Sequence, residues 1–222
     1  MPDSDSQRRA RFEDPLTFFS RAITKLYSMW LSATYPFASL GRKLSVQYPC
    51  QLNKRIAHRI KIGNSVIIRK DAWLNILPEA SGTVNIVVED DCLIGARSVV
   101  SAKNSIHLEK DVIIATSVLI MDHNHAYEDI HRPIREQGAT SGGTIRIEQG
   151  CWIGHGASIV CNQGELVIGR NSIIAANTLV TKSFRPYSVI VGNPGRLGRH
   201  FDPVKGAWVG GVSRAVVPVP TR

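Results

Sequence analysis

The segment VEDDCLIGARSVV (88–100) places an aliphatic residue at every sixth position, with a glycine directly after the second one. A small or β-branched residue follows most of these positions by four, as at Cys92 and Ser98. An α-helix repeats every 3.6 residues and a strand every two, so neither element explains a period of six. Five such triplets recur along the chain: Ile62, Ile68, Leu74; Val88, Ile94, Val100; Leu108, Ile114, Ile120; Ile147, Ile153, Ile159; and Ile168, Ile174, Val180.

A period of six with turn-permitting glycine is typical of short strands joined by sharp corners, with three strands closing one coil. The large aliphatic side chain then points inward once on each face, and the small residue fills the crowded space beside it. Stacked coils pair backbone to backbone at about 4.8 Å, and each coil depends on its neighbours for stability. The sequence therefore predicts an all-β solenoid of about five coils over residues 60–200, roughly 24 Å tall.

The spacing between triplets locates the insertions. A small loop is expected at LPEASGTVN (77–85), and about one coil's worth of extra chain is extruded between the third and fourth triplets. The extruded segment, 122–143, holds three histidines, His123, His125 and His131, and no apolar period. A loop that leaves a rigid scaffold without disturbing its register usually serves function, so this segment is the first candidate for a site.

Composition limits the other possibilities. The chain has 222 residues, is 43% hydrophobic, and carries a net charge of +9. The positive charge lies at the two ends: residues 1–61 hold eleven Lys/Arg and four Asp/Glu, and residues 181–222 hold seven and one. No nucleic-acid motif accompanies these cations, so a solvated surface with basic ends is expected. The four cysteines lack disulfide-like or metal-like spacing, which predicts reduced, buried thiols in a cytoplasmic protein.

The two flanks are expected to lie outside the solenoid. Leu16, Phe19, Ile23, Leu26 and Trp30 follow helical spacing, which predicts an amphipathic helix from about 15 to 34 within an N-terminal cap, 1–59. This helix either covers the open end of the solenoid or contacts the inner face of a membrane through nearby cations. Those cations are Arg8, Arg9, Arg11, Arg21 and Lys25. The C-terminal tail is 201–222, and its segment GAWVGGVSRAVVPVPTR (206–222) is rich in glycine and proline and is expected to be partly disordered.

The repeats and the ending of the chain together resemble the hexapeptide-repeat acyltransferases, of the maltose and polysaccharide O-acetyltransferase kind. The closing segment 168–199 contains VTK (180–182) and GNPGR (192–196), where the family ends its repeats with a similar signature; Gly195 replaces the usual alanine. The resemblance covers roughly residues 60–200. It implies a left-handed parallel β-helix, a homotrimer with active sites between subunits, and acetyl-CoA as donor to a sugar or polysaccharide acceptor, without a metal.

The resemblance also implies roles for particular residues. A histidine at the start of the extruded loop acts as general base in this family, which indicates His123 within MDHNH (121–125), with His125 in reserve. A neutral imidazole suits this task at cytoplasmic pH, and Asp122 or a backbone carbonyl could fix its tautomer. Trp152 is expected beside the reacting centre, or packed against the loop. The residues implied for coenzyme A binding are His155, Ala176, Thr181, Lys182, Arg196 and Arg199.

Two alternatives remain open. The same scaffold carries the gamma-class carbonic anhydrases, in which three histidines hold zinc, and His123, His125 and His155 could serve that purpose. The VTK and GNPGR ending favours the transferase. A solenoid that only binds a partner is the other alternative, and it would neither bind nor turn over coenzyme A.

Overall fold

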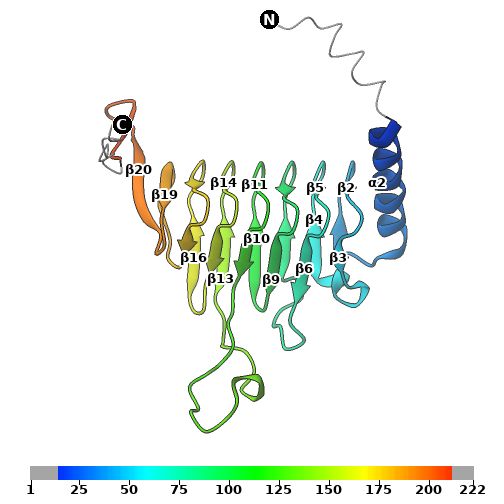
Figure 1. Ribbon diagram of the computed structural model, residues 1–222, viewed down its shortest axis with the longest axis horizontal. Helices are drawn as coiled ribbons and strands as arrows, with labels where there is room; N and C mark the ends of the chain where they lie inside the picture. The colour runs from blue at the N-terminus through cyan, green and yellow to red at the C-terminus, as the bar shows by residue number, and fades with distance from the viewer. Residues whose placement is uncertain (1–14, 212–222) are drawn as a thin grey trace, which may run out of the picture.

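The computed structural model describes residues 15–211, and the chain folds there as a left-handed parallel β-helix behind one N-terminal helix (Figure 1). Each coil gives one strand to each of three sheets, called here the first, second and third sheet. Coil by coil, the strands are β1 (Ser39–Leu40), β2 (Ser45–Val46), β3 (Gln51–Leu52); β4 (Ile60–Ile62), β5 (Ile67–Ile68), β6 (Trp73–Ile76); β7 (Ile86–Val88), β8 (Leu93–Ile94), β9 (Val99–Ala102); β10 (Ser105–Leu108), β11 (Ile113–Ile114), β12 (Leu119–Met121); β13 (Thr144–Ile147), β14 (Trp152–Ile153), β15 (Ser158–Val160); and β16 (Glu165–Ile168), β17 (Ile173–Ile174), β18 (Leu179–Val180).

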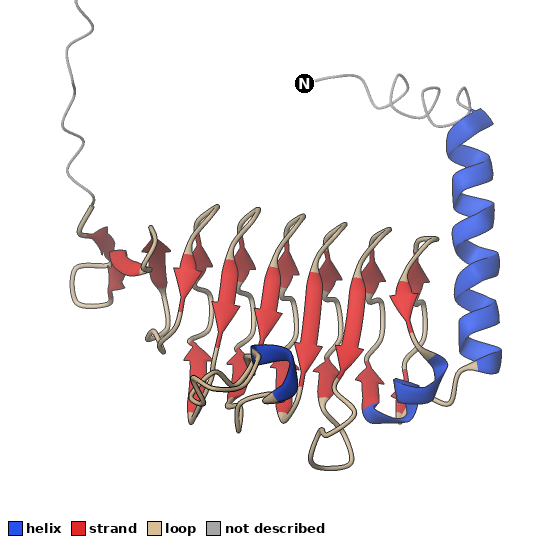
Figure 2. Ribbon diagram, turned by 60° about the horizontal axis from the view of Figure 1, so that its bottom comes forward, coloured by secondary structure: helices blue, strands red, loops and turns tan. Residues whose placement is uncertain are grey.

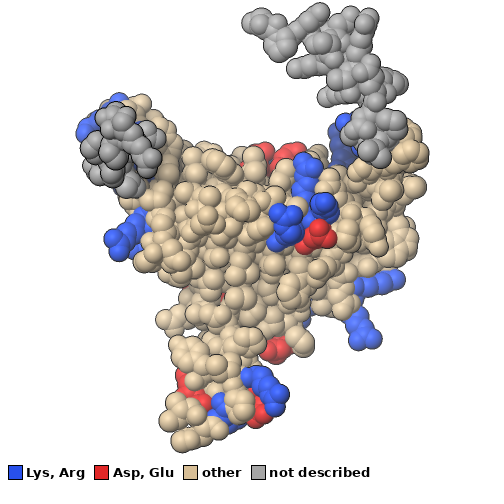
Figure 3. Space-filling model, viewed as in Figure 1, with Lys and Arg blue, Asp and Glu red and all other residues tan. Residues whose placement is uncertain are grey.

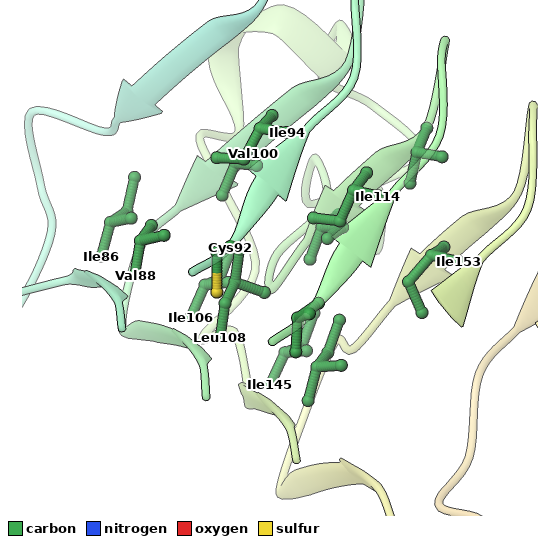
Figure 4. Close-up of a cluster of buried hydrophobic side chains, with 14 of the residues drawn as sticks. Ile86, Val88, Cys92, Ile94, Val100, Ile106, Leu108, Ile114, Ile145 and Ile153 are labelled. Carbon is green, nitrogen blue, oxygen red and sulfur yellow. The ribbon is translucent and has the colours of Figure 1, made fainter. Parts of the chain in front are cut away.

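The predicted triplets are confirmed as three vertical ladders of inward side chains. In the second sheet, for example, Ile94 pairs with Ile114, Ile114 with Ile153, and Ile153 with Ile174. All fifteen predicted positions are buried, and Figure 4 shows several of them side by side in the core. Because each inward side chain lies above its counterpart in the previous coil, the core is continuous from end to end.

The corners explain the smaller residues of the pattern. Asp91 and Arg97 adopt positive φ angles of 59° and 57°, and the buried Cys92 and Ser98 follow them directly. A left-handed residue turns the chain sharply, and the small residue after it fits inside the bend. Gly95 is required for another reason: a Cβ there would lie 2.1 Å from the carbonyl oxygen of Ala115 in the next coil.

The structure has six coils where the sequence analysis counts five. The additional coil, 39–52, precedes the others and lies in the segment assigned to the N-terminal cap. Its inward residues, Leu40, Val46 and Leu52, keep the six-residue step and pair in register with the next coil. Leu40 and Leu52 are only partly buried, because this coil has neighbouring strands on one side alone.

Both expected loops leave the stack of coils, as Figure 2 shows. Residues 77–85 form the short one between β6 and β7, and residues 122–143 form the long one, which contains the 3-10 helix η2 (Ile134–Glu136). A second 3-10 helix, η1 (Lys54–Arg59), joins the first coil to the second. The register of β12 and β13 with their neighbours is undisturbed by the long insertion.

The predicted N-terminal helix is confirmed as α2 (Pro15–Thr34), which lies across the open end of the first coil and contacts β2. Its packing differs from the expected one. Ser28 and Leu31 face the coil and are buried, whereas Phe19, Ile23 and Leu26 remain exposed. The expected stripe therefore points away from the solenoid. The part of the chain that the structure describes contains no helix whose length and apolar character would allow it to cross a bilayer.

The last coil is extended by a strand and a hairpin. β19 (Ser188–Val191) continues the second sheet in parallel, and β20 (Arg196–Asp202) and β21 (Ala207–Val209) add two antiparallel strands. The beginning of the tail is therefore ordered into a sheet, and most of the segment expected to be partly disordered, 206–222, lies beyond it. Residues 212–222, and the N-terminal cations Arg8, Arg9 and Arg11, lie outside the described residues.

Candidate active site

The extruded segment begins at the corner where β12 ends and the chain turns from the third sheet towards the first. Asp122 and His123 occupy this corner, and both are buried, with exposed fractions of 0% and 7%. They follow Met121, which pairs with Ser101 of the preceding coil and Val160 of the following one. The coils on both sides therefore hold the pair, although the loop itself projects into solvent.

The Asp122 carboxylate is surrounded by hydrogen-bond donors. Its two oxygens accept the backbone N–H groups of Lys103 (2.6 Å), Asn104 (2.8 Å) and Ser105 (2.8 Å), which turn the same corner one coil earlier. These three bonds fix the carboxylate against rotation and compensate for its burial.

The same carboxylate orients the imidazole of His123. Oδ1 of Asp122 lies 3.0 Å from Nδ1 of His123. A carboxylate that accepts hydrogen bonds on both oxygens cannot donate, so Nδ1 carries the shared hydrogen, and in the neutral ring Nε2 therefore keeps its lone pair. The corner thus presents a histidine whose outer nitrogen is an acceptor, which is the arrangement that a general base needs.

His123 borders a cavity of about 620 Å³ on the outer surface of the third sheet. One wall is a ladder of outward side chains in register across three coils, Trp73, Val99 and Leu119. The extruded loop forms the opposite wall, and residues 77–79 close one side. Asn75 and Ser101 add polar groups to this otherwise apolar surface, and the Asn75 amide donates to Ser101 Oγ at 3.0 Å. A small polar molecule with an apolar face would fit these walls.

The base of the loop is held to the solenoid by hydrogen bonds. His125 pairs with Ala139 across it, and Lys103 Nζ donates to the carbonyls of Thr140 and Ala139. His125 is exposed and lines the same cavity as His123, so both predicted bases lie at one site. His131 is exposed, lies farther along the loop and does not line the cavity.

Trp152 lies elsewhere in the chain. It belongs to β14 in the second sheet, where it pairs with Ile113 and Ile173, and its side chain is half exposed. The six-residue step rotates the chain from one sheet to the next, so this residue lies on the second sheet, whereas His123 lies at the corner after the third. Within one chain Trp152 borders neither the cavity nor the extruded loop, so neither expected contact forms there.

Two of the residues implied for coenzyme A binding share a different corner, between the second and third sheets. His155 and Ala176 lie one coil apart, and the backbone N–H of Asn177 donates to the His155 carbonyl at 2.8 Å. The His155 ring is hydrogen-bonded to Thr116 Oγ1 at 2.6 Å. The 192–195 turn, which contains the GNPG residues, stacks on this corner through the bond from Gly195 N–H to the Leu179 carbonyl at 2.6 Å.

The remaining implied residues are more widely spread. Arg196 lines a cavity of about 510 Å³ with the 192–195 turn, which places it near the His155 corner. Arg199 lies further along β20 and donates to the Trp208 carbonyl at 3.4 Å. Thr181 and Lys182 follow β18 at its other end, where the Lys182 ammonium lies 5.8 Å from the centre of the Phe184 ring. One chain therefore collects three of these residues near one corner and leaves Thr181 and Lys182 at the opposite end of β18.

The described side chains form neither a metal-binding cluster nor a reactive thiol. Between residues 15 and 211, no three His, Cys, Asp or Glu side chains gather closely enough to hold a metal ion. His155 turns a different corner from His123 and His125. All four cysteines are free, and burial raises the pKa of Cys92 and of Cys151 to about 11 and that of Cys50 to about 12. Such thiols stay protonated at neutral pH and are poor nucleophiles.

The residues that complete the corner do not stand out in the sequence as candidates. Lys103, Asn104 and Ser105 supply the donors to Asp122, and Asn75 and Ser101 supply polar groups to the cavity. A signal did exist, because these residues occupy the corresponding positions of earlier coils. Alignment of the coils on their aliphatic triplets would have placed them beside Asp122 and His123.

Comparison with known proteins agrees with the repeat pattern. The family described as "Hexapeptide repeat of succinyl-transferase" matches residues 85–121 and 144–182, so the match stops and resumes at the extruded loop. A probable acetyltransferase of Mycobacterium tuberculosis is 28% identical over 108 residues, which is 49% of this chain and 35% of that protein. The galactoside O-acetyltransferase of Escherichia coli is 34% identical over 92 residues, 41% of this chain and 42% of the enzyme.

Solved structures show the same fold. An N-acyltransferase of Bacillus cereus, in complex with dTDP and coenzyme A, has a TM-score of 0.63 at 17% identity and covers 80% of this chain and 90% of its own. A hexapeptide-repeat acetyltransferase of Vibrio cholerae, in complex with acetyl coenzyme A, has a TM-score of 0.51 at 22% identity, with coverage of 79% and 76%.

These comparisons confirm the resemblance that the sequence indicates: hexapeptide repeats are matched on both sides of the extruded loop, and the β-helix is similar to that of a solved hexapeptide-repeat acetyltransferase. The aligned part spans less than half of each of the two curated relatives, and the family match ends at Met121, before the His123 corner. The role of the corner must therefore be argued from its own geometry.

Proposed function

We propose that the chain is a coenzyme A-dependent O-acyltransferase that moves an acetyl group from acetyl-CoA to a hydroxyl of a sugar or polysaccharide intermediate. The observation that carries this proposal is the Asp122–His123 corner. It holds an imidazole with a free Nε2 at the mouth of a cavity large enough for a small acceptor. The acetyltransferase relatives and the acyl-CoA complexes of structural neighbours support the reaction class.

The chemistry needs one base in this position. Nε2 of His123 accepts the proton of the acceptor hydroxyl while its oxygen forms a bond to the thioester carbonyl carbon. The tetrahedral intermediate collapses by breaking the carbon–sulfur bond, and the imidazolium returns the proton to the departing sulfur of coenzyme A. Asp122 keeps the ring oriented and stabilises the imidazolium, and a backbone N–H of a neighbouring coil is a suitable donor to the oxyanion.

The donor is assigned to the later coils and the basic end of the chain. Coenzyme A is a polyanion, and residues 181–222 carry seven Lys/Arg against one Asp. In the proposed binding mode, backbone groups at His155 and Ala176 meet the pantetheine arm. Thr181 and Lys182 lie near the nucleotide end of coenzyme A, and Arg196 and Arg199 lie near its phosphates.

A homotrimer is part of the proposal. His123 turns the corner after the third sheet, whereas His155 and Ala176 turn the corner before it, so the third sheet separates them in one chain. A neighbouring chain packed against this sheet would bring its own donor corner to the His123 cavity. The same packing would allow Trp152 of one subunit to approach the site of another.

Transfer to oxygen is favoured over transfer to nitrogen by the sequence relatives. The galactoside O-acetyltransferase is 34% identical over its aligned part, whereas the N-acyltransferase shares only the fold at 17%. A hydroxyl also depends on a base to lose its proton, and the corner supplies one. Because acetyl-CoA is made and used inside cells, the proposal places the chain in the cytoplasm.

The test is release of free thiol from acetyl-CoA in the presence of a panel of sugars and oligosaccharides, with light scattering to determine the number of subunits. The proposal expects thiol release that depends on one acceptor class, from a trimer. A protein that binds acetyl-CoA but transfers only to amines would overturn the assignment to oxygen. Failure to bind acetyl-CoA at all would leave a non-catalytic solenoid.

A further inference from the structure

The outward surface of α2 is more apolar than its surface towards the solenoid. Six large apolar side chains between Phe18 and Trp30 are at least half exposed: Phe18, Phe19, Ile23, Leu26, Met29 and Trp30. At 100° per residue they fall within one arc of roughly 140° on the helix, together with two alanines. These six residues are called the apolar arc below. A helix that served only as a cap would turn such a surface inward.

The opposite surface of α2 makes the attachment to the first coil. Ser28 Oγ accepts the backbone N–H of Val46 at 2.9 Å and donates to the Thr24 carbonyl at 2.6 Å, and Leu31 is completely buried. Tyr27 is partly buried and packs against the core. Of the apolar arc, Trp30 packs on the rings of Tyr27 and Tyr35. The helix is otherwise held to the solenoid by its opposite surface, and that attachment does not account for the other five large apolar residues.

The part of the chain that carries the apolar arc is basic. Residues 15–70, which form α2, the first coil and the start of the second, contain ten Lys/Arg and no Asp or Glu. Arg21 and Lys25 lie along one edge of the arc and line a shallow groove with Leu44. On the other side, Lys70 lines a groove with Phe19 and Ile23. Lys and Arg side chains are visible at this end of the molecule in Figure 3.

We propose that α2 binds the surface of an anionic lipid bilayer. The helix lies in the plane of the interface with its apolar arc at the boundary between headgroups and acyl chains, and the surrounding cations contact lipid phosphates. The positive charge around α2 favours an anionic bilayer over a second copy of the chain as its partner. Pairing two apolar arcs would bring two wholly cationic segments together, whereas an anionic bilayer complements them. The proposal stands apart from the acyltransferase assignment, since it uses none of the residues of that site.

The test uses the full chain and vesicle flotation. Wild-type protein is expected to float with vesicles of phosphatidylcholine and phosphatidylglycerol, and to bind vesicles of phosphatidylcholine alone or at high salt much less. Leu26→Ser with Trp30→Ser should weaken binding by more than about tenfold, because two large side chains no longer enter the interface. Arg21→Gln with Lys25→Gln should weaken it by about fivefold for each cation, and only at low salt.

The matched control is Ile130→Ser with Val204→Ser, which removes two exposed apolar side chains far from α2 along the chain. This variant should bind vesicles like the wild type. All the substituted side chains are exposed, and unchanged thermal midpoints would verify that each variant is folded. Wild-type protein that does not float, or a Leu26/Trp30 variant that floats normally, overturns the proposal. A Leu26/Trp30 variant that loses subunits in light scattering, from a wild type that binds no vesicles, would assign the arc to a second copy of the chain.

Discussion

Successive coils turn the same corner with different residues at the same position. Where the third sheet ends, Ala102 and Cys161 fill the bend in the coils on either side, and Asp122 occupies it in between. All three side chains are buried. An alanine or a cysteine is enough to fill this bend, so the fold itself does not require a carboxylate, and Asp122 is expected to serve function. Its burial is compensated by three backbone N–H groups and by His123. Asp122 therefore departs from the repeat, yet its carboxylate is fully hydrogen-bonded. This combination identifies the candidate site.

Loss of the imidazole should have the largest effect of any change at this corner. His123→Ala should lower turnover by about a hundredfold or more, the usual contribution of a general base, with little change in acetyl-CoA affinity. His125→Ala should cost much less, because that side chain is exposed in the loop. His131→Ala, in the same loop but away from the cavity, is the control. Steady-state thiol release measures all three, and a dead His125→Ala beside an active His123→Ala would move the role to His125.

Replacing the carboxylate should destabilise the protein more than replacing the residue at the equivalent corner of the next coil. Asp122→Ala leaves three backbone donors without their acceptor and should destabilise the protein by about 2–4 kcal/mol. Cys161→Ala, at the same position one coil later, removes one buried sulfur and should cost about 1 kcal/mol. Urea midpoints at equal protein concentration make the comparison. Equal losses in the two variants would show that the Asp122 hydrogen bonds contribute nothing special.

The donor residues should show a smaller, salt-dependent effect. Lys182→Ala with Arg196→Ala should weaken acetyl-CoA binding by about tenfold at low salt and less at high salt, since both cations are assigned to a polyanionic donor. Lys61→Ala, an exposed cation of β4 in the first sheet, should leave affinity unchanged. Calorimetry measures each affinity. Unchanged binding by the double variant at low salt would contradict the donor assignment.

The buried thiols should produce the mildest effect, and only in alkali. Burial raises the pKa of Cys92 and Cys151 to about 11, so the folded protein keeps protons that the unfolded chain releases near its lower thiol pKa. The unfolded state then binds fewer protons, and the free energy of unfolding should fall as pH rises above about 9. Cys92→Ala with Cys151→Ala should flatten this slope. Urea midpoints measured across that pH range would detect it, and a slope unchanged in the variant would exclude the thiols as its source.

Most of the solenoid can be predicted from the sequence because each six-residue period corresponds to one strand and one corner of a coil. The positions of Ile94, Ile114 and Ile153 are enough to assign their sheet and their register. The ends of the extruded loop also follow from counting. Contacts between coils are harder to foresee: the bonds from Lys103 to Asp122 join residues that are nineteen apart, and they appear only when the coils are aligned.

The remaining differences between prediction and structure lie at the N-terminal end of the solenoid, where the coils meet α2 and η1. The first coil follows the six-residue step at Leu40, Val46 and Leu52, but nine residues, including those of η1, separate Leu52 from Ile62 and interrupt the step. Helical periodicity predicts α2 correctly but does not say which of its surfaces meets the solenoid. Leu31 and Ser28 make that contact, a choice that depends on the shape of the first coil.

The tautomer of His123 in the wild-type protein tests the central claim most directly. Nitrogen-15 NMR of histidine-labelled protein distinguishes the two neutral forms of the ring, and the His123→Ala variant identifies the signal. The geometry predicts hydrogen on Nδ1, donated to Asp122, and a free lone pair on Nε2. Hydrogen found on Nε2 would leave no nitrogen able to accept a proton from the cavity, and would contradict the assignment of His123 as the base.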